Sequence, residues 1–231
     1  FVAGLKILLK EHGTITIEFP HLMRLIQGNQ FDTIYHEHFS YFSFTTAEKI
    51  FSAHGLTLFD VEELPTHGGS LRIYACHVGD AVGLRAVTQR VDELRRREKA
   101  EGCTTVAAYA VFHEQVKAAK RNLLAFLIDV RTRGKLVAGY GAPGKGNTLL
   151  NYCGIRRDLL EFTVDRNPYK QGMFLPGTHI PILHPDRIAA VRPDYVLILP
   201  WNFKDEIVQQ LSYIREWGGQ FVIPIPTLTV I

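Results

Sequence analysis

The densest group of chemically active side chains in this sequence is Tyr35-His36-Glu37-His38. Aromatic residues flank the group on both sides, which predicts a setting from which water is partly excluded. A histidine there can act as a general base near neutral pH, with Tyr35 or Glu37 orienting it or stabilising developing charge. On the residues alone, two alternatives stay open: His36 and His38 could ligate zinc or iron, or the side chains could form a hydrogen-bonded loop without chemistry. Spacing places no third ligand, so we expect no metal site.

A second group is the glycine-rich segment Gly139-Tyr140-Gly141-Ala142-Pro143-Gly144, which follows an expected strand and precedes an expected helix. This G-x-G-x-x-G spacing, with Asp165 at the end of the next expected strand, is typical of a dinucleotide-binding turn. Lys145 adds a positive charge that suits a phosphate, whereas Pro143 removes one N–H donor. Phosphate or nucleotide contact, dinucleotide binding and a purely structural turn all stay open.

Two further segments combine a turn with polar or aromatic side chains. His67-Gly68-Gly69-Ser70-Leu71-Arg72 joins a flexible turn to a hydroxyl and a guanidinium, which suits contacts to an anion or a sugar. A plain hairpin turn with an exposed arginine explains it equally well. Pro200-Trp201-Asn202-Phe203 follows an expected strand, at the end where open α/β sheets bind ligands, and packing is again the alternative.

The elements that must position these groups change character along the chain. Up to residue 78, expected helices cover residues 1–10, 22–26 and 45–54, and expected strands cover 14–19, 56–62 and 70–78, the last two as an antiparallel pair. Residues 81–133 are expected to be helical, with a break at 101–103. Thr45 with Glu48 predicts a capping box, and the charge run from Glu93 to Lys99 predicts a solvated helix face.

Strands and helices alternate after residue 135, which is typical of a parallel sheet with crossover helices. Expected strands cover residues 135–139, 160–164, 194–199 and 220–225, and expected helices start at 147, 186 and 205. The predicted class is α/β, with a Rossmann-like C-terminal domain built on a mainly parallel sheet. We place the domain boundary after residue 78, so that residues 79–231 hold a helical connector and this domain.

Composition narrows the classes of partner. A formal charge of +3, from 26 basic and 23 acidic residues in 231, is too balanced for a nucleic-acid binder, so any anionic partner is expected to be small. Three cysteines without a C-x-x-C pair favour a reducing, cytoplasmic setting. Apolar runs are too short for a membrane span, and no membrane association is expected. Because the first ten residues already look like part of a helix, we expect a fragment of a longer chain.

Three of these segments, taken together and in this order, resemble the nucleotide-sugar C-methyltransferases. They are residues 31–38 with Tyr41-Phe42, residues 67–72, and residues 139–147. The resemblance spans essentially the whole chain. It implies a C-terminal Rossmann-like domain preceded by the closing part of a class I methyltransferase domain, in residues 1–78. The zinc domain of the family and its glycine-rich S-adenosylmethionine turn have no counterpart here, so we expect this fragment alone to be inactive.

The resemblance also implies roles for individual residues. His38 would be the base that removes a proton next to a ketone of a nucleotide-linked deoxysugar, and Tyr35 and Glu37 would be its neighbours. Ser70, Arg72, Lys145 and Asn147 would be candidate contacts to the nucleotide-diphosphate sugar. S-adenosylmethionine would be the cofactor of the longer enzyme. Two rival hypotheses remain: an NAD(P)-dependent oxidoreductase, or a non-catalytic nucleotide-sugar-binding module.

Overall fold

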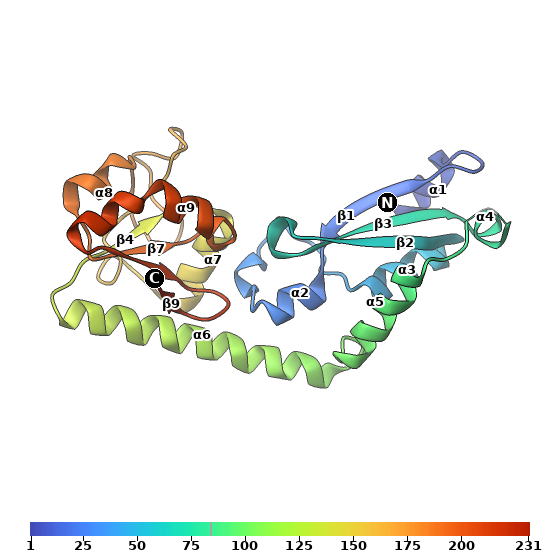
Figure 1. Ribbon diagram of the computed structural model, residues 1–231, viewed down its shortest axis with the longest axis horizontal. Coiled ribbons are helices and arrows are strands. Elements are labelled where there is room, and N and C mark those ends of the chain that lie inside the picture. Colours follow the sequence, from blue (N-terminus) through green and yellow to red (C-terminus); the bar gives the residue numbers. More distant parts are fainter. Residues whose placement is uncertain (84) are drawn as a thin grey trace. The chain divides into compact units, whose positions relative to one another are not determined.

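The computed structural model describes residues 1–83 and 85–231; Leu84, within the predicted helical stretch, lies outside the described residues. The chain forms two compact units (Figure 1). The first comprises residues 1–28 and 39–112, and the second comprises residues 29–38 and 113–231. The predicted boundary followed residue 78, at the end of the strand pair. Compactness instead divides the chain within a long helix, and it assigns the short segment 29–38 to the second unit.

The first unit is built on a three-stranded antiparallel sheet of order β1-β3-β2 (Figure 1). The strands are β1 (Ile15–Pro20), β2 (Leu56–Leu64) and β3 (Ser70–His77). The helices are α1 (Val2–Leu8), α2 (Leu22–Gln27), α3 (Phe44–Ala53), α4 (Val78–Gly83) and α5 (Gln89–Ala100). Alternate side chains of β2 and β3 are buried against α3 and α5, as expected for a sheet with one covered face. The predicted antiparallel strand pair is confirmed.

A buried carboxylate, Glu98 of α5, joins three elements of this unit. It receives a hydrogen bond from the His21 side chain at 2.8 Å, and from the Phe44 and Thr45 backbone N–H groups at 2.6 and 2.8 Å. The Thr45 hydroxyl donates to it as well, at 2.6 Å. Glu98 therefore caps the start of α3 and holds the residue that precedes α2. Burial opposes its charge, but the hydrogen bonds from His21 and Thr45 keep its pKa below its usual range.

Glu98 corrects two predictions made from the sequence. The charge run at residues 93–99 is not wholly a solvated face, because Glu98 is completely buried. The capping box of Thr45 and Glu48 does not form: Ser43 is the N-cap and accepts from the Thr46 N–H, while Glu48 pairs with Arg95. Local spacing could not reveal the contacts of α3 with Glu98 or of Glu48 with Arg95, because Glu98 and Arg95 lie about fifty residues further along the chain.

The second unit holds a six-stranded sheet of order β6-β5-β4-β7-β8-β9, parallel except for the last pair. The strands are β4 (Val137–Tyr140), β5 (Thr163–Val164), β6 (Ile182–Leu183), β7 (Tyr195–Ile198), β8 (Gln220–Ile223) and β9 (Thr229–Val230). The fold is α/β with a mostly parallel, Rossmann-like sheet, as predicted. The two-residue strand β6 and the antiparallel edge strand β9 were not predicted, because such short pairings leave no periodic signal.

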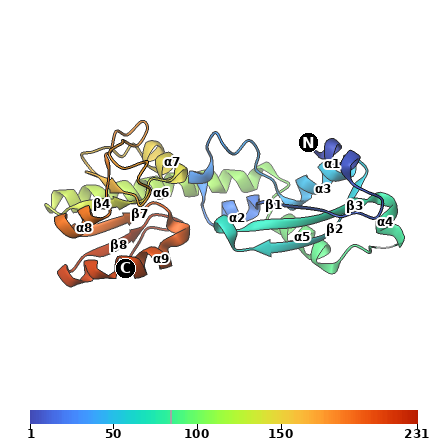
Figure 2. The same ribbon diagram turned by 90° about the horizontal axis from the view of Figure 1, so that it is seen from above.

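Helices cover both faces of this sheet (Figure 2). They are α6 (Val106–Thr132), whose later part belongs to this unit, α7 (Gly144–Cys153), α8 (Asp186–Val191) and α9 (Lys204–Gln210). All side chains of the central strands β4 and β7 are buried, which explains why both strands are continuous apolar runs. Helix α7 begins three residues before the predicted start at Asn147, because Pro143 takes the N-cap position and the glycines enter the first turn. The helix predicted from residue 205 breaks after α9 and continues as a 3-10 helix, Ser212–Trp217.

Among the helices that the structure describes, none is both long enough and apolar enough to cross a bilayer.

Replacing Glu98 with alanine is expected to lower the free energy of unfolding of the first unit by about 3–5 kcal/mol, because His21 and the start of α3 lose a shared buried partner. Denaturation followed by circular dichroism measures the loss. Tryptophan fluorescence reports on the other unit, since Trp201 and Trp217 both lie there. The exposed neighbour Glu101→Ala is the control and should change stability by less than about 0.5 kcal/mol. Equal stability of both variants would contradict the role of Glu98.

Candidate functional site

The segment that carries Tyr35, Glu37 and His38 packs within the second unit, far along the chain from its neighbours there. It opens with a 3-10 turn, Phe31–Thr33. The Phe31 ring is buried and lies 5.2 Å, centroid to centroid, from the ring of Tyr152 on α7. The Asn29 side chain donates to the Gln115 carbonyl of α6 at 3.4 Å. The expected loop is therefore an ordered part of the Rossmann-like unit.

Residues 35–38 form a tight turn that brings two of the predicted site residues together. The His38 N–H donates to the Tyr35 carbonyl at 3.0 Å. The two rings meet edge to face, with centroids 4.8 Å apart and planes 73° apart. Both side chains are half-buried, whereas His36 and Glu37 are exposed. The His36 ring lies farther from Tyr35, at 6.3 Å between centroids, so His38 is the histidine with the closer aromatic contact.

The ring of Tyr35 also lies against the start of α7. A Cβ atom added to Gly144 would stand 3.3 Å from the Tyr35 Cζ and 3.6 Å from its hydroxyl oxygen. That approach is closer than ordinary van der Waals contact, so any larger residue at this position would press on the ring. The glycine turn and the Tyr-His-Glu-His group, which the sequence places about a hundred residues apart, are in direct contact.

Asp32, three residues before Tyr35, is completely buried and bonded to Trp201. One carboxylate oxygen accepts from the Trp201 indole N–H at 2.7 Å, and the other has no hydrogen-bond partner among the described residues. Burial raises the pKa of Asp32 to about 6, against the hydrogen bond from Trp201 and the charge of Lys145. At neutral pH the protein therefore holds a mostly ionised, incompletely paired carboxylate in its interior.

Lys145 lies on the other side of the same indole. Its ammonium is 4.4 Å from the centroid of the Trp201 ring and donates to the Asn202 side-chain oxygen at 2.5 Å. Burial lowers the pKa of Lys145, while the charge of Asp32 opposes that change. Trp201 thus contacts an anion through its edge and a cation through its face, an arrangement that suits the ring's charge distribution.

The glycine turn is filled by the protein's own side chains. A Cβ at Gly141, where φ is +89°, would stand 2.6 Å from Pro200, and one at Gly139 would stand 2.7 Å from Thr163. The Ala142 N–H, a donor that a phosphate could use, donates to the Asp165 carboxylate at 2.7 Å. Asp165 is the residue that a dinucleotide site would offer to a ribose. These contacts favour a structural turn and weigh against the oxidoreductase hypothesis.

The remaining predicted contact residues fall into both units. Asn147 belongs to α7, and its side-chain oxygen accepts from Asn151 at 3.3 Å. Ser70 is buried in the first unit and donates to the Thr66 carbonyl at 3.1 Å. Arg72, also in the first unit, donates to Glu18 at 3.1 Å. The structure groups Lys145 and Asn147 with the Tyr35–His38 segment, and it gives Ser70 and Arg72 partners within the first unit.

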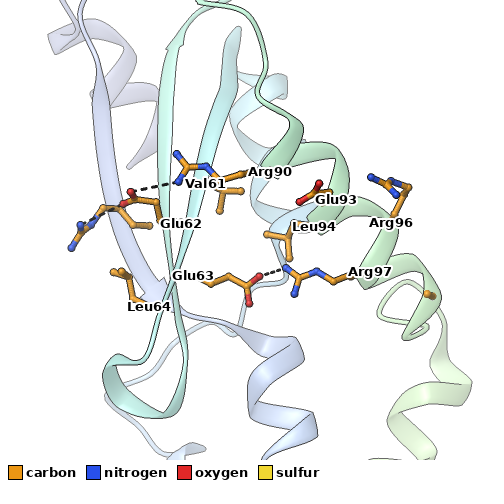
Figure 3. Close-up of a pocket in the computed structure, with 11 residues that line it drawn as sticks. Val61, Glu62, Glu63, Leu64, Arg90, Glu93, Leu94, Arg96 and Arg97 are labelled. Carbon is orange, nitrogen blue, oxygen red and sulfur yellow. Dashed lines mark hydrogen bonds and ion pairs between the residues drawn. The ribbon is translucent and has the colours of Figure 1, made fainter.

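A groove of about 1040 Å³ lies between β2 and α5 in the first unit (Figure 3). Its charged walls are arginines balanced by glutamates of β2. Arg90 lies 3.7 Å from Glu62, Arg97 pairs with Glu63, and Arg72 lies 3.6 Å from Glu62. Three of the four arginines that line the groove therefore have an acidic partner, and the fourth is Arg96; the pairing reduces the attraction of the groove for an anion.

Sequence reasoning missed Asp32 as a functional candidate, and it found Trp201 only as a residue at a ligand-binding edge. The local sequence does not identify the partner of Asp32, which lies 169 residues away. The usable signal was an acidic residue directly after the apolar Phe31, three residues before Tyr35. An acidic side chain in such a place needs a buried partner.

Comparison with known proteins adds two findings. A family described as "C-methyltransferase C-terminal domain" matches residues 65–226. The chain is 39% identical, over 228 residues, to the C-methyltransferase NovU of Streptomyces niveus. That alignment covers 99% of this chain and 54% of NovU, so the chain spans about half the length of this relative.

The pKa of Asp32 predicts a specific dependence of stability on pH. Because the folded-state pKa, about 6, exceeds the ordinary value of 3.8, the carboxyl group costs no stability at low pH. As the pH rises from about 4 to above 6, ionisation removes about 3 kcal/mol of stability. The Asp32→Asn variant lacks this loss, so its stability relative to the wild type should rise by that amount between pH 4 and 7.5.

Urea denaturation at several pH values, followed by tryptophan fluorescence, measures the difference. Other titrating groups are common to both proteins and cancel in the comparison. The matched control is Asp158→Asn, which changes an exposed carboxyl group of the same unit and should alter stability by less than about 0.5 kcal/mol. A constant difference for Asp32→Asn would mean that Asp32 titrates normally.

Proposed function

The chain belongs to the C-methyltransferase family, and from that premise we propose that it is the C-terminal portion of an S-adenosylmethionine-dependent enzyme that methylates a carbon of a nucleotide-linked keto-deoxysugar. The observation that carries the proposal is the turn in which the half-buried His38 imidazole lies edge to face with Tyr35. It supplies a positioned base with a phenol beside it, and the reaction needs both.

The part of the reaction assigned to this chain is proton removal. A C–H bond next to a ketone is acidic because the charge left behind spreads onto the ketone oxygen. A ring nitrogen of His38 would take that proton, and the electron pair of the broken bond would form the enolate. The Tyr35 hydroxyl is the candidate donor to the developing oxyanion, and Glu37 is a candidate partner for the imidazolium.

The glycine turn does not offer the methyl donor a fitting place. The one turn that resembles a nucleotide cradle is packed by Thr163, Pro200 and Tyr35, and Asp165 takes its Ala142 N–H. S-adenosylmethionine, which supplies an electrophilic methyl group, is therefore assigned to residues outside this sequence. Ser70, Arg72, Lys145 and Asn147 remain the candidate contacts to the nucleotide diphosphate sugar.

A non-catalytic nucleotide-sugar-binding module is the second candidate for the chain on its own. The packing of the glycine turn by the protein's own side chains favours it for the isolated chain. It differs from the enzyme hypothesis only in what the longer protein does with the bound sugar.

In the full-length protein, His38→Ala is expected to lower turnover by about 10² to 10⁴-fold while leaving the affinity for a dTDP-keto-deoxysugar nearly unchanged, because a general base acts in the transition state. Tyr35→Phe should cost less, since the base remains. The matched control is the exposed His36→Ala, which should keep near-normal turnover. If His38→Ala still exchanged the α-proton of the substrate with solvent deuterium at the normal rate, His38 would not be the base.

The isolated chain is expected to bind dTDP weakly and to show no measurable affinity for S-adenosylmethionine. Calorimetry measures both, and Lys145→Ala should weaken dTDP binding if the ammonium contacts the diphosphate. Titration with NADH, followed by its fluorescence, tests the oxidoreductase alternative and should give no signal. Tight binding of S-adenosylmethionine would contradict the assignment of the donor to residues outside this chain.

A further inference from the structure

The backbone conformation at position 144 does not require a glycine. Gly144 is the first residue of α7, and its φ lies outside the left-handed region, so an alanine could adopt the same backbone conformation. Alanine is also the better helix former, by up to about 1 kcal/mol. What the glycine permits is the approach of Tyr35, whose ring carbon would stand 3.3 Å from an added Cβ.

Asp32 and Trp201 fix the same segment at its other end. Their hydrogen bond, 2.7 Å long and buried, joins the turn at residues 31–33 to the loop that follows β7. As a source of stability the pair is poor, because the second carboxylate oxygen of Asp32 is buried without a partner among the described residues. A directional bond between a buried carboxylate and an indole does, however, fix where the turn lies.

Lys145 connects these two contacts. It follows Gly144 directly in the sequence, and its ammonium lies 4.4 Å from the centroid of the Trp201 ring. Trp201, which bonds to Asp32, is therefore in contact with Lys145. Lys145 is the neighbour of Gly144, against which the Tyr35 ring packs. From Tyr35 the chain continues through the tight turn to His38, whose ring lies 4.8 Å away.

We propose that the Rossmann-like unit positions Tyr35 and His38 for reaction through two contacts, the Asp32–Trp201 hydrogen bond and the seat that Gly144 forms under the Tyr35 ring. The proposal rests on the proposed function for its catalytic consequence. Asp32, Trp201 and Gly144 are positioning residues: they touch neither the substrate nor the transferred proton, and they act by fixing the rings that do. The glycine turn, which in related folds makes room for a phosphate, here makes room for a side chain of the same protein.

A structural test needs no substrate. In the isolated chain, the histidine NMR signal that disappears in His38→Ala identifies His38, and Tyr35→Ala gives its position without the neighbouring ring. Gly144→Ala and Trp201→Phe are each expected to move the His38 signal toward that position. Trp217→Phe, which removes an indole N–H bonded to the Pro193 carbonyl in the same unit, is the matched control and should leave the signal in place. Gly79→Ala, in a helix with open space around the glycine, controls for the added methyl group.

The kinetic test uses the full-length protein. Gly144→Ala should lower kcat roughly ten- to hundredfold, since small misplacements of reacting groups are costly, while KM for the sugar nucleotide stays close to normal. Its thermal stability should be unchanged or higher, which separates this effect from unfolding. In a Tyr35→Ala background the same alanine should have no further effect on kcat, because the ring on which it acts is gone.

An unchanged His38 signal in folded Gly144→Ala and Trp201→Phe overturns the proposal. A shifted His38 signal together with a normal kcat in Gly144→Ala also overturns it, because the contact with Gly144 would then fix the Tyr35 ring without affecting the reaction. If the wild-type protein transfers no methyl group, the proposed function fails, and the NMR result still decides whether the two contacts fix the rings. If Trp201→Phe does not fold, Gly144→Ala carries the test alone.

Discussion

The hydrogen bond from the Trp201 indole to the buried carboxylate of Asp32 is the constraint on which the candidate site depends. It ties a ten-residue segment, which would otherwise be a surface loop between two helices of another unit, to a domain formed by the end of the chain. The bond is directional, and its acceptor is costly to bury, so it is better suited to fixing a geometry than to raising stability. Phe31, the contact of Tyr35 with Gly144, and the pairing of Tyr35 with His38 then complete the placement.

Most of the fold follows from periodicity and could be predicted. The strands β1, β2 and β3 alternate, the strands β4 and β7 are unbroken apolar runs, and strand-helix alternation after residue 135 indicates a parallel sheet. What could not be predicted depends on partners distant in sequence. From the sequence, Glu98 looks like any other charged residue of an exposed helix, because its partners His21 and α3 lie far away along the chain. The short strands β6 and β9 are defined only by their pairing with neighbouring strands.

In the candidate site, too, the features visible in the local sequence could be predicted, and the contacts between distant segments could not. Residue types and spacing were enough to single out the group Tyr35–His38 and the glycine turn, because titratable side chains and glycines are visible locally. The choice of His38 as the base came from the family resemblance. Their mutual contact was not visible, and the glycine pattern left phosphate contact, dinucleotide binding and a structural turn open, because the same spacing accommodates a phosphate or a side chain. Only the three-dimensional structure shows that Thr163, Pro200 and Tyr35 occupy the space the glycines leave.

The sequence separation of Asp32 and Trp201 has a consequence for the order in which the protein is made. The two residues are 169 positions apart, and at ordinary rates of translation, the first exists for roughly 10 to 30 seconds before the second is synthesised. During that time the segment with Tyr35 and His38 has no domain to dock on, although the strands of the first unit can already pair. The nascent chain can thus organise the sheet of its first unit early and the segment with Tyr35 and His38 last, and a chain released before residue 201 lacks the partner that holds this segment.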